Sequence, residues 1–315
     1  MQPRASLLIT DLDDTIWYWF KAWHASFSAL LRTLEEDTGI PREILTRQIK
    51  AVHERHHTSE YAFLLQELPC LIERYGKGFD PVATLPKVIL AFRNARKETF
   101  GLYPTVFDTL NLIHRNGTRI VAFTESHLFY SVQRLKKSGL DGIIDVLYAP
   151  SEDGHVTPEQ LRIARRYSDS SYELIDTKMV SLAHGLKKPN PKVLNDILRD
   201  EHSEASRAVY VGDTLSKDIA MANQAHIRSA HAQYGETHLN PDYELLKSVT
   251  HWTLSEVANQ RQANPTIIRP TFVLNREFAQ LLDFVTFESP KNDESRRKKT
   301  GSECMGKSYR NAGAL

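Results

Sequence analysis

A short apolar run that ends in a group of acids is the feature that most constrains this chain. Leu7-Leu8-Ile9 has the branched side chains and the abrupt polar boundary of a buried strand. After Thr10 come Asp11-Leu12-Asp13-Asp14-Thr15, and side chains two apart lean to the same side of an extended backbone. Asp11 and Asp13 would repel each other there, so the pattern indicates a compensating charge, most simply a divalent cation. The alternative is that Asp13, Asp14 and Thr15 are turn and helix-cap residues after a strand.

Three later segments fit the same site. Residues 120–123 predict a second buried strand that ends in Thr124-Glu125-Ser126, and residues 209–211 predict a third that ends in Gly212-Asp213-Thr214. Asp218 follows five residues after Asp213. Between these strands, Lys187-Lys188-Pro189-Asn190-Pro191 opens a helical pattern over residues 192–198.

In these four motifs the chain resembles the haloacid dehalogenase (HAD) superfamily, and within it the metal-dependent, phosphoglycolate-phosphatase-like phosphatases. The motifs span Asp11 to Asp218, and the resemblance extends over residues 5–258. It implies that Asp11 is the nucleophile and that Asp13 is the general acid and base. The backbone carbonyl of Asp13 would also bind the metal.

The resemblance assigns the remaining roles as well. Lys187 competes with Lys188 for the place of the family lysine, and Lys188 is preferred because the family pattern sets the lysine directly before proline. The implied phosphate-binding residues are Thr124 and Lys188, and the implied magnesium-binding residues are Asp11, Asp13, Asp213 and Asp218.

The chemistry explains why these residue types are needed. At about 4 Å and an effective dielectric of about 20, two like unit charges repel by roughly 4 kcal/mol, and a phosphate monoester dianion roughly doubles that. Mg²⁺ prefers oxygen ligands and keeps several waters, so a few carboxylates suffice to hold it. Asp11 would form an aspartyl-phosphate, which divides the reaction into two steps. Asp13 would protonate the leaving oxygen and then deprotonate the attacking water.

The order of elements predicts an α/β fold, a Rossmann-like parallel sheet flanked by helices. Residues 104–116 predict a helix that ends at Gly117, followed by a strand at 119–123 and a helix at 127–138. Alternating strands and helices imply a covered parallel sheet, in which ligands bind at the carboxyl ends of the strands. The strand-terminal motifs all lie at such ends.

A helical insert is expected directly after the first motif. Apolar residues recur at helical spacing over 19–34, from Pro41 onward, over 63–72 with an interruption at Pro69, and over 88–95. In the family, a cap at this point closes over the site and helps to select substrates. The expected domains are a core at 1–15 and 101–260, a helical cap at 16–100, and a C-terminal extension at 261–315 with a helix around 278–282 and disorder from about 288. The connection 151–186 has no assigned function.

Composition bounds the partners. Forty basic and thirty-nine acidic residues leave a net charge of +1, which argues against general attraction to nucleic acid or to anionic membrane. Two cysteines, no signal peptide and no stretch as long as a membrane span fit a cytoplasmic protein. The expected partner is therefore a small-molecule phosphate ester, with no nucleic acid and no membrane. A disordered tail is favoured over a nucleic-acid arm for the run Arg296-Arg297-Lys298-Lys299.

Two further groups have more than one interpretation. His53, His56 and His57 have spacing that could bind a transition metal, although a solvated helix end is the commoner role, and neighbouring Arg55 could contact a substrate. The aromatic residues of the second group either line an apolar pocket or pack the cap, and packing is favoured; they are Trp17, Tyr18, Trp19, Phe20 and Trp23.

The favoured function is a magnesium-dependent phosphomonoester hydrolase. A 2-haloacid dehalogenase is one alternative, but family members of that kind lack an acid at the position of Asp13. A sugar-phosphate mutase is separable from a phosphatase only by its products. A non-catalytic binding module is disfavoured because the acids and the lysine are all present. The sequence does not identify the substrate or the oligomeric state.

Overall fold

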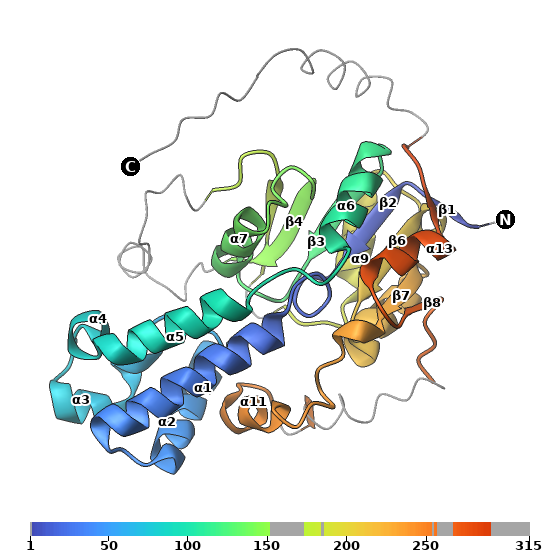
Figure 1. Cartoon of the computed structure of the whole chain (residues 1–315). Helices are drawn as coiled ribbons and strands as arrows, with labels where there is room; N and C mark the ends of the chain where they lie inside the picture. Colours follow the sequence, from blue (N-terminus) through green and yellow to red (C-terminus); the bar gives the residue numbers. More distant parts are fainter. Residues whose placement is uncertain (1, 152–172, 184–185, 254, 257–266, 291–315) are drawn as a thin grey trace, which may run out of the picture.

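A seven-stranded parallel sheet forms the centre of the larger lobe (Figure 1). The computed structural model describes residues 2–151, 173–183, 186–253, 255–256 and 267–290. The strand order is β5-β4-β3-β2-β6-β7-β8, so β2 lies centrally and later strands extend from it on both sides. The strands are β2 (Leu7–Thr10), β3 (Arg119–Phe123), β4 (Val146–Pro150), β5 (Lys178–Leu182), β6 (Ala208–Gly212), β7 (Arg228–Ala232) and β8 (Phe272–Leu274).

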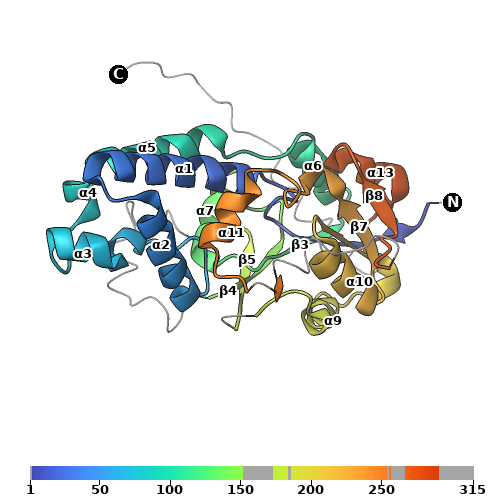
Figure 2. The same cartoon turned by 90° about the horizontal axis from the view of Figure 1, so that it is seen from below.

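Helices cover both faces of this sheet, with α6 and α13 on one side and α9 and α10 on the other (Figure 2). Alternate residues of each strand face opposite layers: Leu8 packs toward the first layer, whereas Leu7 and Ile9 pack toward the second. The central strands are therefore buried on both faces, as expected for an α/β core, whereas the edge strand β5 is largely exposed. The core helices are α6 (Val106–Arg115), α7 (Leu128–Lys137), α9 (Pro191–Asp200), α10 (Ala220–Gln224) and α13 (Leu281–Phe284).

The insert after β2 is helical and lies at one end of the molecule (Figure 1). Its first helix ends at Gly39, whose φ of 67° suits the left-handed turn at a helix end. Pro69 begins α3 after a short 3-10 turn at Leu64–Glu67, which explains the interruption in the sequence pattern. The helices are α1 (Trp19–Thr38), α2 (Arg42–His56), α3 (Pro69–Tyr75), α4 (Pro81–Thr84) and α5 (Pro86–Thr99).

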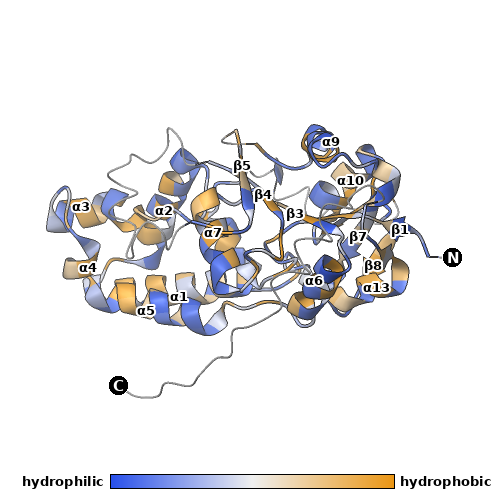
Figure 3. Cartoon of the chain, turned by 90° about the horizontal axis from the view of Figure 1, so that it is seen from above, coloured by the Kyte–Doolittle hydropathy of each residue, from blue (hydrophilic) through white to orange (hydrophobic). Residues whose placement is uncertain are grey.

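The insert has its own apolar cluster, separate from the two layers of the sheet. Helices α1 and α5 carry both hydrophobic and hydrophilic residues along their length (Figure 3), and their apolar side chains pack together. Helix α11 (Tyr243–Val249) joins this cluster although it lies within the range expected for the core. The Nδ1 atom of His53 on α2 donates to the carbonyl of Val249, 2.7 Å away, which fixes α11 against the insert.

The C-terminal segment contributes to the core. Strand β8 is the edge strand of the main sheet, and β9 (Thr286–Phe287) pairs in parallel with β1 (Arg4–Ala5) near the N-terminus. The helix expected around 278–282 is present as a 3-10 turn, Phe278–Gln280, that continues into α13. Part of the connection 151–186 and the basic run at 296–299 lie outside the described residues. No described helix is both long enough and apolar enough to cross a membrane.

Candidate active site

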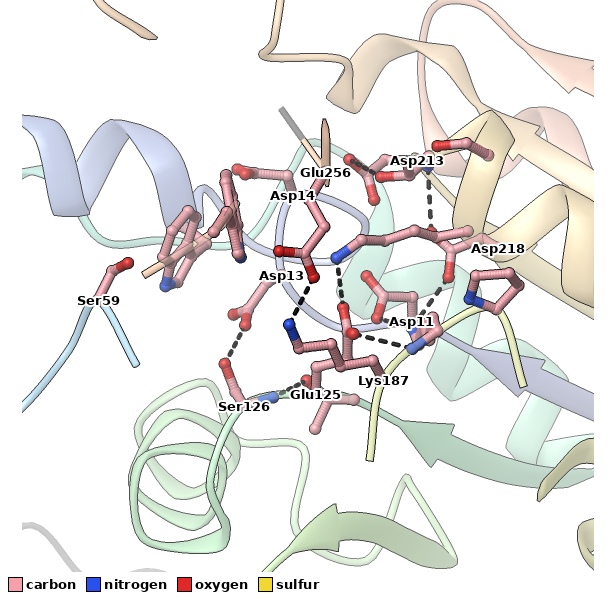
Figure 4. A pocket seen from close by; sticks show the side chains of 18 of the residues that line it. Asp11, Asp13, Asp14, Ser59, Glu125, Ser126, Lys187, Asp213, Asp218 and Glu256 are labelled. Atoms are coloured by element: carbon pink, nitrogen blue, oxygen red, sulfur yellow. Dashed lines mark hydrogen bonds and ion pairs between the residues drawn. The ribbon is translucent and has the colours of Figure 1, made fainter. Parts of the chain in front are cut away.

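The carboxyl ends of three neighbouring strands meet at one cavity. Strand β2 lies between β3 and β6, so Asp11, Thr124 and Asp213 follow adjacent strand ends at the point where the sheet order reverses. The cavity has a volume of about 1060 Å³. All six residues expected from the sequence line it, namely Asp11, Asp13, Thr124, Lys188, Asp213 and Asp218. Figure 4 shows the four aspartates among them.

Asp11 is buried and held from two sides. Thr15 Oγ1 donates to its Oδ2 at 3.2 Å, and Lys188 Nζ donates to its Oδ1. Lys188 is itself buried, reaches Asp218 Oδ1 at 2.9 Å, and lies with its ammonium 4.9 Å from the ring centre of Phe123. Lys187 instead pairs with Glu256. The geometry therefore brings Lys188, and not Lys187, to the first carboxylate.

Burial dominates the electrostatics of these acids. It raises the pKa of Asp11 to about 7, although Lys188 opposes the change. Burial, followed by the charges of Asp218 and Asp11, raises the pKa of Asp213 well above its usual range. The pKa of Lys188 is raised despite its burial, because Asp11 and Asp218 stabilise its charge. The carboxylates are thus held together against their repulsion.

A metal would fit this cluster. Asp11, Asp213 and Asp218 each offer one oxygen, and these oxygens lie within 4.8 Å of one another. A set of hard carboxylate oxygens in a crowded acidic site matches the preference of Mg²⁺. A nearby divalent charge would also favour the ionised form of Asp11 that nucleophilic attack requires. The side chain of Asp13 does not belong to this group of oxygens.

Close packing fixes Asp218. Tyr210 OH donates to its Oδ1 at 2.8 Å, and the backbone N–H of Thr214 donates to its Oδ2 at 3.1 Å. A Cβ atom on Gly212 would lie 2.4 Å from the Asp218 Cγ atom, so the end of β6 has room only for glycine. The close approach of Asp218 therefore explains the glycine of the Gly212-Asp213 pair, in addition to the chemical role expected for Asp213.

Asp13 is held by three donors. Trp17 Nε1 donates to its Oδ1 at 2.5 Å, Arg134 donates to the same oxygen at 3.1 Å, and Ser126 Oγ donates to Oδ2. Trp17 is completely buried, so its indole N–H is fixed in place. The carboxyl group of Asp13 consequently has a defined orientation at the edge of the cavity (Figure 4).

Arg134 also connects the core to the insert. Its second amino group donates to both carboxylate oxygens of Glu60, each at 2.6 Å. Glu60 receives further bonds from Arg96 at 2.5 Å and from Trp19 Nε1 at 3.0 Å. Although burial opposes it, Arg134 and then Arg96 lower the pKa of Glu60 to about 2, so this carboxylate is ionised at neutral pH.

The loop after β3 supplies the remaining polar groups. Thr124 is buried, its N–H donates to the Tyr148 carbonyl at 3.1 Å, and its Oγ1 accepts from the Ser126 N–H at 3.0 Å. Glu125 accepts from the Lys188 backbone N–H at 2.9 Å and from Lys217 Nζ at 2.7 Å. Thr124 thus lines the cavity directly after the end of β3.

Sequence reasoning missed the roles of Glu60 and Arg134. The two lie 74 residues apart, so no short motif could join them. The histidine cluster divides: His53 is buried rather than solvated, His56 bonds to Glu67 at 2.9 Å, and His57 lines the cavity. Arg55 pairs with Glu67 and does not line the cavity.

The aromatic group also divides between packing and the cavity. Trp19 lines the cavity, whereas Phe20 and Trp23 pack inside the insert. Trp17 belongs to the core and bonds to Asp13, so it has both a packing and a positioning role.

Comparison with known families agrees with this geometry. The family model described as haloacid dehalogenase-like hydrolase matches residues 5–226. The chain belongs to this family. A related HAD-hydrolase-like model matches residues 185–275, so HAD-like sequence continues through α11 and β8. The parallel sheet flanked by helices, expected from the sequence, is confirmed.

Two curated relatives share part of their sequence with this chain. The chain is 22% identical over 236 residues to a glyceraldehyde 3-phosphate phosphatase of Methanopyrus kandleri, covering 73% of this chain and 84% of that protein. It is 32% identical over 104 residues to a glyceraldehyde 3-phosphate phosphatase of Pyrococcus furiosus, covering 33% and 39% of the two chains. The HAD-hydrolase YfnB from Bacillus subtilis, solved with bound magnesium, aligns with a TM-score of 0.47 at 17% identity over 89% of this chain and 98% of its own.

Proposed function

We propose that this chain is a magnesium-dependent phosphomonoester hydrolase that acts on a small phosphorylated molecule through an aspartyl-phosphate. The observation that carries the proposal is a buried Asp11 paired with Lys188, with oxygens of Asp213 and Asp218 within 4.8 Å. Two relatives named as phosphatases support the same reaction class. The substrate is proposed only as a phosphate ester of low molecular mass.

Each step has a residue suited to it. An Asp11 oxygen attacks phosphorus and forms a new P–O bond, while the ester P–O bond breaks. Asp13 gives its proton to the leaving alcohol oxygen, and it later takes a proton from the water that attacks the aspartyl-phosphate. Lys188 and Thr124 are positioned to hold the phosphoryl oxygens, because both line the cavity beside Asp11. Hydrolysis releases phosphate and regenerates Asp11.

The proposed metal ligands are Asp11, Asp213, Asp218 and the backbone carbonyl of Asp13. When bound, Mg²⁺ would reduce the repulsion between the carboxylate of Asp11 and the phosphate dianion. The residues of the chain supply the rest: Asp218 keeps Lys188 oriented through their 2.9 Å contact, and Tyr210 and Thr214 keep Asp218 in place.

We also propose that residues 16–100 act as the cap of this enzyme and that residues 1–15 and 101–260 form its catalytic core. Glu60, Trp19 and His57 come from the insert and line the cavity, so the insert takes part in enclosing a substrate. Enclosure would exclude water and strengthen the electrostatic contacts inside. Helix α11 is grouped with the cap by its packing.

The test is phosphate release from a panel of phosphate esters with and without magnesium. Chelation should abolish release, and added magnesium should restore it. Asp213→Asn should raise the magnesium concentration for half-maximal rate by roughly tenfold or more, because one carboxylate ligand is replaced by an amide. Asp196→Asn is the matched control, since Asp196 pairs with Arg199 at the surface and does not line the cavity.

Full phosphate release from chelated protein would contradict the proposal. Metal-free release of halide from a 2-haloacid would instead identify a dehalogenase. A panel product that is an isomer of the substrate, with no free phosphate, would identify a mutase.

A further inference from the structure

The cavity has many more acidic than basic groups among the residues that the structure describes. Its lysines are Lys187, Lys188 and Lys217. Its carboxylates are Asp11, Asp13, Asp14, Glu60, Glu125, Asp213, Asp218 and Glu256. A bound magnesium ion would offset part of this acidity, and Glu60, Glu125 and Glu256 line the cavity without belonging to the cluster of Asp11, Asp213 and Asp218 that could hold the metal.

Each of these lysines already has a carboxylate partner. Lys188 serves Asp11 and Asp218, Lys217 pairs with Glu125 at 2.7 Å, and Lys187 pairs with Glu256. The pKa of Glu256 is lowered to about 2 by its bonds to Lys187 and Thr253 although burial opposes the change, so its charge persists in any assay near neutral pH. Every lysine in the described lining is therefore already paired with a carboxylate. A second anionic group on the substrate would find no unpaired lysine there beyond the phosphate position.

The two arginines nearest the cavity are also engaged. Arg134 is only 6% exposed at its side chain and is shared by Asp13 and Glu60. Arg96 donates to Glu60 at 2.5 Å, and neither arginine lines the cavity. Glu60 thus presents a carboxylate, rather than either arginine, to the interior.

His251 adds no charge to the cap side of the cavity. His251 bonds to Ser59 Oγ at 3.1 Å, and burial, with the nearby Lys187, lowers the pKa of His251 to about 3, so its ring is neutral. Trp19 and Trp252 present aromatic surface to the cavity. Such a lining fits hydroxyl, carbonyl or ring groups better than a carboxylate, which would lose its hydration without a compensating cation.

We infer that the site selects phosphomonoesters whose leaving alcohol carries no negative charge, and that it rejects esters with a second anionic group such as a carboxylate or another phosphate. This inference rests on the proposed function. Rejection arises from the acidic lining, because a second anion would face Glu60 and would have to displace Glu256 or Glu125 from a lysine. Glu256 thus has a role in specificity, although Glu256 itself does not touch the phosphate position.

The experiment compares glycerol 3-phosphate with 3-phosphoglycerate, which share a three-carbon skeleton and differ in a terminal hydroxymethyl or carboxylate group. Assays at pH 8 with saturating magnesium keep an imidazole of ordinary pKa, about 6.5, uncharged. The wild-type kcat/KM should favour glycerol 3-phosphate by roughly tenfold or more; where an ester is not turned over, its inhibition constant against p-nitrophenyl phosphate replaces kcat/KM. Equal constants, or a preference for 3-phosphoglycerate, would overturn the inference.

Glu256→Gln tests the origin of the selectivity. The change frees Lys187, so the ratio between the two esters should fall severalfold through better use of 3-phosphoglycerate. Asp196→Asn, which removes one of the two carboxylate partners of Arg199 at the surface and does not line the cavity, should leave the ratio unchanged. An unchanged ratio of the two kcat/KM values in Glu256→Gln would show that Glu256 does not contribute to the selectivity.

Failure of the proposed function gives a different result. It would appear as no hydrolysis of p-nitrophenyl phosphate under any metal condition. In that case calorimetric binding of the same two esters still measures the selectivity, and tighter binding of 3-phosphoglycerate would overturn the inference by itself.

Discussion

At the scale of single residues, the site depends on side chains that have little freedom to move. Asp13 has three donors, Lys188 is enclosed by two carboxylates and two aromatic rings, and Asp218 packs directly on the backbone of Gly212. Rigid placement of this kind favours catalysis, because reacting atoms must be held near their productive geometry.

Gly212→Ala should disturb the position of Asp218 while leaving the protein folded. The new methyl group would overlap Asp218, so either that side chain or the end of β6 must move. We expect a folded protein whose kcat/KM on an activated phosphate ester falls by roughly tenfold to a hundredfold, because small displacements in a catalytic site have effects of this order. Steady-state kinetics and circular dichroism check both parts.

Gly101→Ala is the matched control, since a Cβ atom there meets nothing within 4 Å and its φ is not in the left-handed region. Wild-type kinetics in Gly212→Ala would mean that Asp218 can shift without consequence.

At the scale of elements, two of the contacts between the insert and the rest of the chain have consequences that can be tested. Arg134 of α7 reaches Glu60 beyond the end of α2, and His53 of α2 reaches Val249 at the end of α11. The first contact links the insert to Asp13. The second fixes a helix that follows the sheet in sequence but packs with the insert in space.

The burial of His53 should make stability depend on pH, although its bond to the Val249 carbonyl opposes the change in pKa. Burial lowers the pKa of His53 to about 4, below the ordinary value of 6.5, so the unfolded chain binds the proton more readily. The stability from neutral His53 is fully present above pH 6.5 and is lost as the pH falls toward 4, by an amount on the order of 3 kcal/mol. The free energy of unfolding in urea, measured from pH 7.5 to 4.5, checks this.

His53→Gln should reduce the slope of that free energy against pH by about one proton, even if it lowers stability at pH 7. His251 contributes to the same window, because its pKa is also lowered by burial, so a slope remains. His226→Asn at an exposed position should leave the slope as in the wild type. A His53→Gln slope equal to the wild-type slope would contradict the assignment.

The elements also indicate what the sequence can predict. Leu7–Ile9, Ile120–Phe123 and Val209–Val211 were expected to be strands, and all three lie inside parallel strands. Their patterns are local, because a buried strand needs only a short apolar run with a polar boundary. The packing of α11 on the insert was not predictable, since the apolar face of Tyr243, Leu246 and Val249 would fit either lobe.

At the scale of the whole molecule, the residues proposed to react could be predicted from the sequence, whereas the residues that position them could not. The residues that would react lie at strand ends and have sequence motifs, so their common location follows from the sheet topology. Arg134, Glu60 and Glu256 have no motif, because their roles arise only when distant segments meet. The C-terminal strand β8 was likewise hidden, since three residues at a sheet edge give too short a pattern to recognise.

The central claim is that Asp11 forms a covalent bond to phosphorus. The most direct measurement is phosphate release from p-nitrophenyl phosphate by wild-type and Asp11→Asn protein at saturating magnesium, with circular dichroism as the check on folding. Because an amide is a poor nucleophile, we expect a loss of turnover on the order of 10⁴-fold or more in a folded variant. Turnover close to that of the wild type in folded Asp11→Asn would contradict it.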